Sequence, residues 1–350
     1  GRLQGMGYFE DVNVGFEPGD DPSVLNLVLT VVEKKTGHFG FSVSHGSESG
    51  WAGGLDYTDT NWRGLGHNVN LGFETGDNER YWITYTQPFM DEKTYAWKAG
   101  IYKQYYDDVN YYRKGLKQLE YDENKKGVFF GAGKKFRHDS KLSWFVTLEW
   151  KDVEVSDKKY QTGITSDDLD SGTTFSVVGT LTRNNLDEYL SYPKGDVIDL
   201  SLEQAFDFLG GDYNYTKYWI QGRYYLPIPG ITEYFGGTSL ITEDNPAIFA
   251  ARVKAGFSSG ELPTAGRYSI GGASTLRGYD GGQFEGDDMF LANLELRIPV
   301  DKTFNFVVFY DTGNAWGSDG SYSLSDLYDS WGFGVRVRTP IGNIRFDIAE

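Results

Sequence analysis

The chain has 350 residues, a formal charge of −17, 45 Gly, 23 Phe, 25 Tyr, 9 Trp and no Cys. The acidic balance argues against nucleic acid as a partner, because a phosphate-binding surface needs clustered Lys and Arg. The lack of Cys excludes disulfide frameworks, Cys-ligated zinc, iron–sulfur clusters and thiol catalysis. Glycine is frequent but follows no G-X-Y period, which excludes collagen. Together with the aromatics it indicates strands and turns.

The first 35 residues differ from the rest. Gly1–Tyr8 has the pattern of the end of a short helix, and Leu25–Val32 predicts a strand closed by charged residues. One strand and part of a helix cannot bury a core of their own. We therefore expect residues 1–35 to be the tail of a domain that begins upstream.

From residue 36 onward the hydrophobic period is two, which predicts strands with one apolar face. Trp144, Val146, Leu148 and Trp150, for example, alternate with polar residues. The pattern predicts about fifteen strands, near residues 37–46, 50–61, 66–76, 79–88, 94–106, 125–136, 142–156, 172–184, 195–206, 213–227, 247–259, 287–299, 304–316, 329–339 and 342–350.

These segments have the length of membrane-crossing strands, about 9–13 residues, whereas globular strands average about 5–6. Aromatics gather near their ends, as in interfacial girdles, and include Tyr111, Tyr112, Trp316 and Trp331. Tight turns alternate with long acidic connections at 152–172, 230–246 and 260–287, which we interpret as external loops. The predicted fold is an all-β transmembrane antiparallel barrel over residues 36–350. Bacterial barrels close with an even strand number, so we expect 16 strands, of which the final one would lie outside this sequence.

A large soluble all-β protein such as a propeller is the alternative. Blades give a repeat of about 40–50 residues, and the sequence shows no such repeat. Signals for catalysis are weak as well, since the four His are scattered and neither HExxH nor G-x-S-x-G occurs. We expect no enzyme activity, no cofactor and no metal site.

The most informative segment is Ser269–Gln283, a glycine-rich stretch in a long polar connection with Arg277 near its middle. Glycine allows the backbone to fold tightly, and a guanidinium is a permanently charged, forked anchor. Strand parity provides carboxylates for that anchor, because Glu295, Asp311 and Asp347 fall on inward-facing positions.

Several motifs resemble, in colinear order, the bacterial outer-membrane assembly and translocation superfamily, and in particular its BamA-type barrel-assembly insertases. The C-terminal motifs are Gly-Gly-x-x-x-Leu-Arg-Gly-Tyr at 271–279, Glu295–Pro299, Phe309–Trp316 and Gly332–Gly342. Gly7–Val12 and Leu29–Lys34 are similar to the end of the last POTRA domain of the family, and Leu55–Trp62 to its second barrel strand. The resemblance implies a partial POTRA domain at 1–35 and a 16-stranded barrel.

In that family the long sixth external loop folds into the barrel lumen and is held by its arginine. The residues that match the loop motif are Gly271, Gly272, Leu276, Arg277, Gly278 and Tyr279. Glu295 and Asp311 would be the lumenal partners of Arg277. The alternative is that Arg277 is a solvated loop charge.

The resemblance also implies that the first and last barrel strands pair weakly, so that the seam opens to an incoming strand by β-augmentation. The first seam strand is predicted at Gly37, His38, Phe39, Gly40, Phe41, Ser42, Val43 and Ser44. The opposite seam strand is the one expected to be absent.

The implied function is an outer-membrane assembly factor that folds and inserts β-barrel proteins. Its expected partners are unfolded outer-membrane barrel substrates, periplasmic accessory proteins or lipoproteins, and the lipid bilayer. The expected location is the bacterial outer membrane, with the N-terminal segment in the periplasm. A TamA-type or two-partner-secretion translocator and a passive outer-membrane pore are the alternatives.

Overall fold

The computed structural model describes residues 8–19, 25–46, 50–76, 78–89, 94–137, 140–164, 169–187, 190, 192–228, 246–301, 303–317, 322–339 and 342–350. In these residues the regular structure is almost entirely β. The strands are β1 (Phe9–Pro18), β2 (Leu25–Glu33), β3 (Gly37–Gly46), β4 (Gly50–Trp62), β5 (His67–Gly76), β6 (Asn78–Gln87), β7 (Tyr95–Arg113), β8 (Leu116–Lys135), β9 (Leu142–Tyr160), β10 (Gly172–Asn184), β11 (Gly195–Ala205), β12 (Tyr215–Ile228), β13 (Ala247–Gly260), β14 (Tyr268–Ile270), β15 (Phe284–Gly286), β16 (Asp288–Pro299), β17 (Phe304–Trp316), β18 (Tyr328–Thr339) and β19 (Gly342–Ala349). One 3-10 turn, η2 (Thr264–Gly266), precedes β14.

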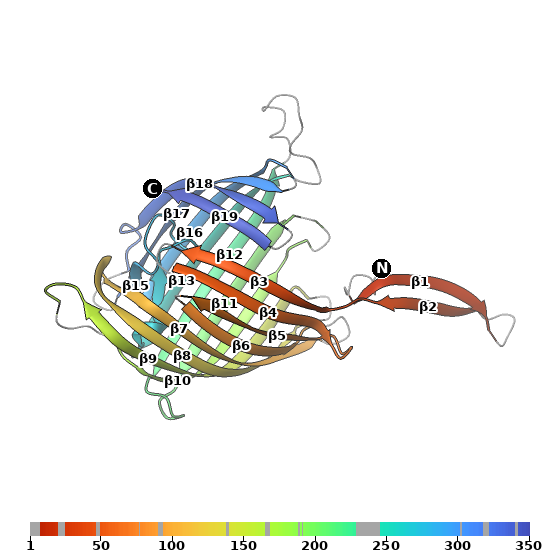
Figure 1. Ribbon diagram of the computed structural model, residues 1–350, viewed down its shortest axis with the longest axis horizontal. Helices are drawn as coiled ribbons and strands as arrows, with labels where there is room; N and C mark the ends of the chain where they lie inside the picture. The colour runs from red at the N-terminus through yellow and green to blue at the C-terminus, as the bar shows by residue number, and fades with distance from the viewer. Residues whose placement is uncertain are drawn as a thin grey trace, which may run out of the picture.

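Fifteen of these strands form one antiparallel sheet. Its order is β3 through β13 and then β16 through β19, so each strand pairs with its neighbours along the chain. Figure 1 shows this sheet curved round on itself, with β3 and β19 as its two edges. The fifteen strands lie where the period of two predicts them, and the predicted all-β barrel fold is confirmed. A single continuous sheet also excludes the separate blades of a propeller.

The outer face of the sheet is apolar and exposed. On β19, Ile344, Phe346 and Ile348 are 43%, 65% and 66% exposed, and Phe39 and Phe41 on β3 are exposed too. A contiguous apolar exterior of this extent needs lipid rather than water around it. Charged and polar side chains take the alternate positions and point into the lumen.

The hairpin of β7 and β8 is longer than predicted. Pairing continues past residue 106, through two register shifts, to Arg113↔Leu116 at its tip. Tyr111 and Tyr112, expected in an interfacial girdle, are buried here, and Trp316 is buried likewise. That expectation is wrong for these three residues, because the extended hairpin and the loop between β13 and β16 cover them instead of lipid.

The connection expected at residues 230–246 lies almost wholly outside the described residues, so its position stays a prediction.

The N-terminal strands form a separate unit. β1 and β2 pair antiparallel from Phe9↔Glu33 to Pro18↔Leu25 and extend away from the large sheet (Figure 1). The strand predicted at Leu25–Val32 is present as β2, whereas β1 was not predicted. The helix end expected at Gly1–Tyr8 lies almost wholly outside the described residues. No helix in the described ranges has the length and apolar character needed to cross a membrane.

Candidate functional site

The connection from β13 to β16 builds a small apolar core of its own inside the curved sheet. Tyr268 and Ile270 on β14 and Phe284 on β15 pack with Leu276 of the loop and with Met289 and Leu291 at the start of β16. Ile270 and Leu276 are fully buried. Burying each such side chain stabilises the seated loop by about 1.5–3 kcal/mol. The loop is therefore a packed structure and not a solvated link.

Glycines give this loop its backbone path. Gly271, Gly272 and Gly278 have φ angles of 128°, 85° and 90°, which side chains with a Cβ rarely adopt. A Cβ at Gly271 would lie 2.1 Å from the carbonyl oxygen of Asp280. The turn is closed by the Gly272 amide, which donates to the Tyr279 carbonyl at 3.0 Å. These contacts aim the segment between Gly272 and Gly278 at the barrel wall.

The Arg277 guanidinium projects from this turn towards the carboxylates of Asp311 and Glu295. Its Nε and Nη2 donate to the two carboxylate oxygens of Asp311, each at 2.6 Å, and its Nη1 donates to Glu295 Oε1 at 2.7 Å. The guanidinium also lies over the ring of Phe309, 3.5 Å from its centroid. Arg277 is 4% exposed and Asp311 is fully buried. Such a forked, charge-assisted contact is both strong and directional, and it leaves no room for a solvated Arg277.

Asp311 is saturated with donors. Besides the guanidinium, it accepts from the Arg277 backbone amide at 3.2 Å and from Asn293 Nδ2 at 2.7 Å. The same Asn293 amide donates to the Thr275 carbonyl at 2.7 Å. Asn293 thus joins the loop backbone to the barrel carboxylate, a role that the sequence did not indicate.

The ion pairs continue from the loop to the edge strand β19. Asp347 on β19 accepts from Arg336 and Arg345, each at 2.5 Å, and lies 3.7 Å from Arg277 Nη1. Glu295 in turn accepts from Arg297 at 2.8 Å. The position of the loop is therefore linked, through shared carboxylates, to the last strand of the sheet.

Tyr279 and the hairpin β7–β8 hold the outer side of the loop. The Tyr279 hydroxyl donates to the Asp329 carbonyl at 3.1 Å. Tyr112 near the hairpin tip donates to Asp280 at 2.9 Å, and Gln283 donates to the Gly115 carbonyl at 3.3 Å. The sequence did not predict these contacts between the β7–β8 hairpin and the loop, because residues 107–124 lack a simple apolar alternation.

Glu285 on β15 is half-buried in this loop, and its buried Oε2 has no hydrogen-bond partner among the described residues. Burial raises the pKa of Glu285 to about 8; the charge of Arg267 opposes this rise and that of Glu123 adds to it. Near neutral pH the carboxyl group is therefore mostly protonated in the folded loop, whereas it is ionised in the unfolded chain.

This pKa difference predicts a pH-dependent loop. The Glu285 carboxyl group binds its proton more tightly in the folded state than in the unfolded chain. Its contribution to the stability of the folded loop is therefore complete below about pH 4.5 and is lost as pH rises through about 8. Protease protection of the loop should decline between pH 6 and 9, and Glu285→Gln should remove most of the decline. An equal decline in Glu285→Gln would contradict the assignment.

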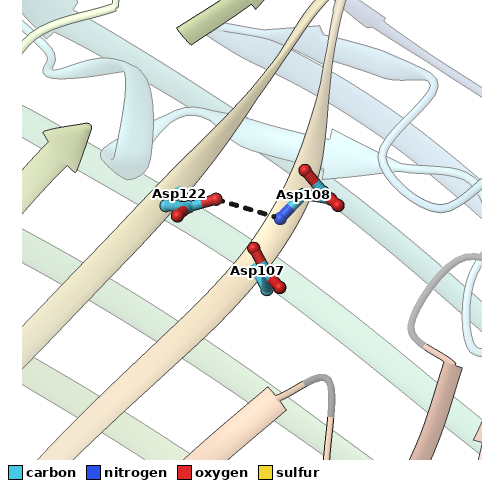
Figure 2. A group of neighbouring side chains, drawn as sticks. All are labelled: Asp107, Asp108 and Asp122. Atoms are coloured by element: carbon cyan, nitrogen blue, oxygen red, sulfur yellow. Dashed lines mark hydrogen bonds between the residues drawn. The ribbon is translucent and has the colours of Figure 1, made fainter. Parts of the chain in front are cut away.

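Three carboxylates meet in the part of the sheet where β7 and β8 extend towards their hairpin, next to the end of β9. Figure 2 shows Asp107, Asp108 and Asp122, whose ligand atoms lie within 4.8 Å of one another. Asp122 accepts from the Asp108 amide at 3.2 Å and from the Tyr105 hydroxyl at 2.7 Å, and Lys159 pairs with Asp108 at 2.5 Å. The hydrogen bond to Asp122, together with burial, raises the pKa of Asp107. The ammonium group of Lys159 offsets part of the repulsion within this cluster.

The predicted seam strand is the β3 edge of the sheet. Residues 37–44 pair with β4 in register from Gly37↔Asp59 to Ser44↔Ala52. On their other side no described strand pairs with them. β19 is likewise paired only with β18. Two unpaired strand edges in one sheet are available for further backbone pairing.

The fold and the loop define the class of protein: an antiparallel outer-membrane-type barrel whose lumen holds an arginine-anchored loop. Residues 61–350 match the Omp85 superfamily domain. The chain belongs to the Omp85 superfamily, which confirms the family expected from the motifs.

Two curated relatives match nearly the whole chain. Outer envelope protein 80, chloroplastic, of Arabidopsis thaliana is 24% identical, with 98% of this chain and 48% of the relative covered. Outer membrane protein assembly factor BamA of Nitratidesulfovibrio vulgaris is 23% identical, with coverages of 99% and 43%. The chain thus spans about half the length of these relatives.

Solved structures show the same fold. BamA from Haemophilus ducreyi lacking POTRA domains 1–3 superposes with a TM-score of 0.73 at 20% identity, covering 100% of this chain and 73% of that one. CdiB from Acinetobacter baumannii gives a TM-score of 0.63 at 17% identity, with coverages of 97% and 61%. These likenesses show that the chain shares the barrel fold of both structures.

Proposed function

We propose that the chain is the barrel of an outer-membrane protein assembly factor, which folds and inserts β-barrel proteins at the seam between β3 and β19. The observation that carries this proposal is the pair of free strand edges in a sheet whose loop is tied to one of those edges through Asp347. The sequence similarity to two BamA proteins, which extends over nearly the entire chain, supports the proposal. No reacting group or cofactor is needed, because backbone pairing and lipid exposure do the work.

The proposal includes the organisation of the chain and its partners. Residues 1–35, with the hairpin of β1 and β2, would be the C-terminal part of the last POTRA domain on the periplasmic side, and residues 36–350 the barrel. Unfolded outer-membrane barrel proteins would be the substrates, with periplasmic accessory proteins or lipoproteins alongside. The likeness to CdiB keeps a translocator of the same superfamily as the second candidate.

The chain has no Cys, which makes site-specific cross-linking a direct test. Val43→Cys places a thiol on the free-edge strand β3, and Val253→Cys is a matched control on β13, which is paired on both sides. Both valines are exposed on the outer face. In the full-length protein, Val43→Cys should form a disulfide with single-Cys outer-membrane barrel substrates during their insertion, and Val253→Cys should not.

Two outcomes would contradict the assignment. Equal cross-linking at both positions would show that the β3 edge is not the entry site. Cross-links from Val43→Cys to a single secreted protein, with none to barrel substrates, would favour the translocator.

A further inference from the structure

A cavity of about 180 Å³ lies between the loop and the barrel wall. It is lined by five arginines from five parts of the chain, namely Arg223 on β12, Arg252 on β13, Arg277 in the loop, Arg297 on β16 and Arg345 on β19. Small side chains, among them Ala250 and Ala273, leave the space open. A gathering of guanidinium groups is unusual in a chain with a net charge of −17.

Four of these five arginines have their own carboxylate. The pairs are Arg223 with Asp199 at 2.9 Å, Arg277 with Asp311 at 2.6 Å, Arg297 with Glu295 at 2.8 Å and Arg345 with Asp347 at 2.5 Å. Arg252 has no carboxylate partner among the described residues. Its contact there is a hydrogen bond from Nη2 to the Ser274 carbonyl at 3.1 Å, and its buried Nε has no acceptor. The Nε of Arg223 is also buried without an acceptor.

The strand register places Arg223 and Arg252 next to each other without a carboxylate between them among the described residues. Arg223 and Arg252 are direct cross-strand neighbours, and like charges in that position repel each other. A second such pair in the same barrel, Arg336 and Arg345, is bridged by the carboxylate of Asp347. No described carboxylate bridges Arg223 and Arg252, although the cavity beside them has room for one.

We propose that this cavity is an oxyanion-binding site that takes a phosphate or carboxylate group between Arg252 and Arg223. Guanidinium groups bind such anions through paired, charge-assisted hydrogen bonds. A bound oxyanion supplies the acceptor that the two Nε atoms lack and offsets the repulsion between the two strands. Because Ser274 and Thr275 of the loop also line the cavity, the anion stabilises the loop in its seated position.

The site is tested by titrating the folded chain in lipid micelles at constant ionic strength. Inorganic phosphate should bind and raise the temperature at which the barrel unfolds, and chloride at equal ionic strength should not. Arg252→Gln should weaken phosphate binding by about tenfold or more. Lys254→Gln is the matched control, since Lys254 is on the same strand but lies over Trp219, outside the cavity lining, and should bind phosphate like the wild type.

A second variant separates loss of the site from loss of folding. Ala250→Leu fills the cavity and keeps all five arginines, so it should fold but no longer bind phosphate. A short peptide with a free C-terminal carboxylate and its amidated form distinguish the two sources of the oxyanion, because only the free acid should compete with phosphate if a chain terminus is the natural ligand.

Three results would overturn the proposal. They are the absence of any phosphate binding, equal binding by the wild type and Arg252→Gln, and unchanged binding by Ala250→Leu. The first denies the site, and the other two place the binding elsewhere on the protein.

Discussion

Arg277→Ala is expected to lower the free energy of unfolding of the barrel by about 3–5 kcal/mol, because it leaves the buried carboxylate of Asp311 without its main partner. Asp311 is fully buried and accepts three of its four hydrogen bonds from Arg277. The folded form should lose its heat resistance on a semi-native gel, and its urea midpoint should fall. The loop should become sensitive to protease at the same time.

Arg183→Ala is the matched control for this experiment. Arg183 on β10 is exposed and pairs with the half-buried Asp196 at 3.1 Å, so its loss should change stability by about 1 kcal/mol, well below the effect at Arg277. The double variant Arg277→Ala with Asp311→Ala should be less destabilised than the sum of the two single variants, since it leaves no unpaired buried charge. Full heat resistance of Arg277→Ala would show that the pair does not hold the loop.

Gly271→Val is expected to unseat the loop with a cost on the order of 3 kcal/mol or more. Gly271 has a φ of 128°, and its substituent would meet the Asp280 carbonyl oxygen at 2.1 Å. Neither the backbone angle nor the contact can relax without opening the turn that aims Arg277 at Asp311. Protease cleavage between residues 261 and 287 should therefore increase, with a lower urea midpoint of the whole barrel.

Gly222→Ala controls for the loss of a glycine as such. Gly222 on β12 has open space where a Cβ would be, so this change should stay within about 0.5 kcal/mol of the wild type. A stable, protease-resistant Gly271→Val would mean that the seated loop does not depend on the glycine turn.

Much of the fold follows from local sequence. A period of two is a property of each strand, and in a meander each strand pairs with its neighbours in sequence, so strand positions and inward-facing residues are readable without long-range information. Glu295 and Asp311 were placed in the lumen in this way. Sequence parity could also place Asp347 there, but not its contact with Arg277.

The parts that were missed depend on contacts that are distant in sequence. The extension of β7 and β8 packs on the loop and mixes charged residues with buried Tyr and Leu, so it lacks the simple apolar alternation that marks the other strands. Asp122 meets Asp107 and Asp108 at a register shift, where they lie between the pairs Tyr106↔Glu123 and Val109↔Tyr121. The buried Tyr112 donates a hydrogen bond to Asp280, which is 168 residues away in the chain.

The sequence by itself determined a membrane-crossing β-sheet with a glycine-rich loop and a charged lumen, since alternation and turn chemistry are local. Only the tertiary structure decided which charges pair. Inward-facing arginines all look alike in the sequence, and the seated loop gives Arg277 two carboxylates and leaves Arg252 with none among the described residues. The physical reason is that an ion pair depends on distances of a few ångströms between strands, and only the packed barrel sets those distances.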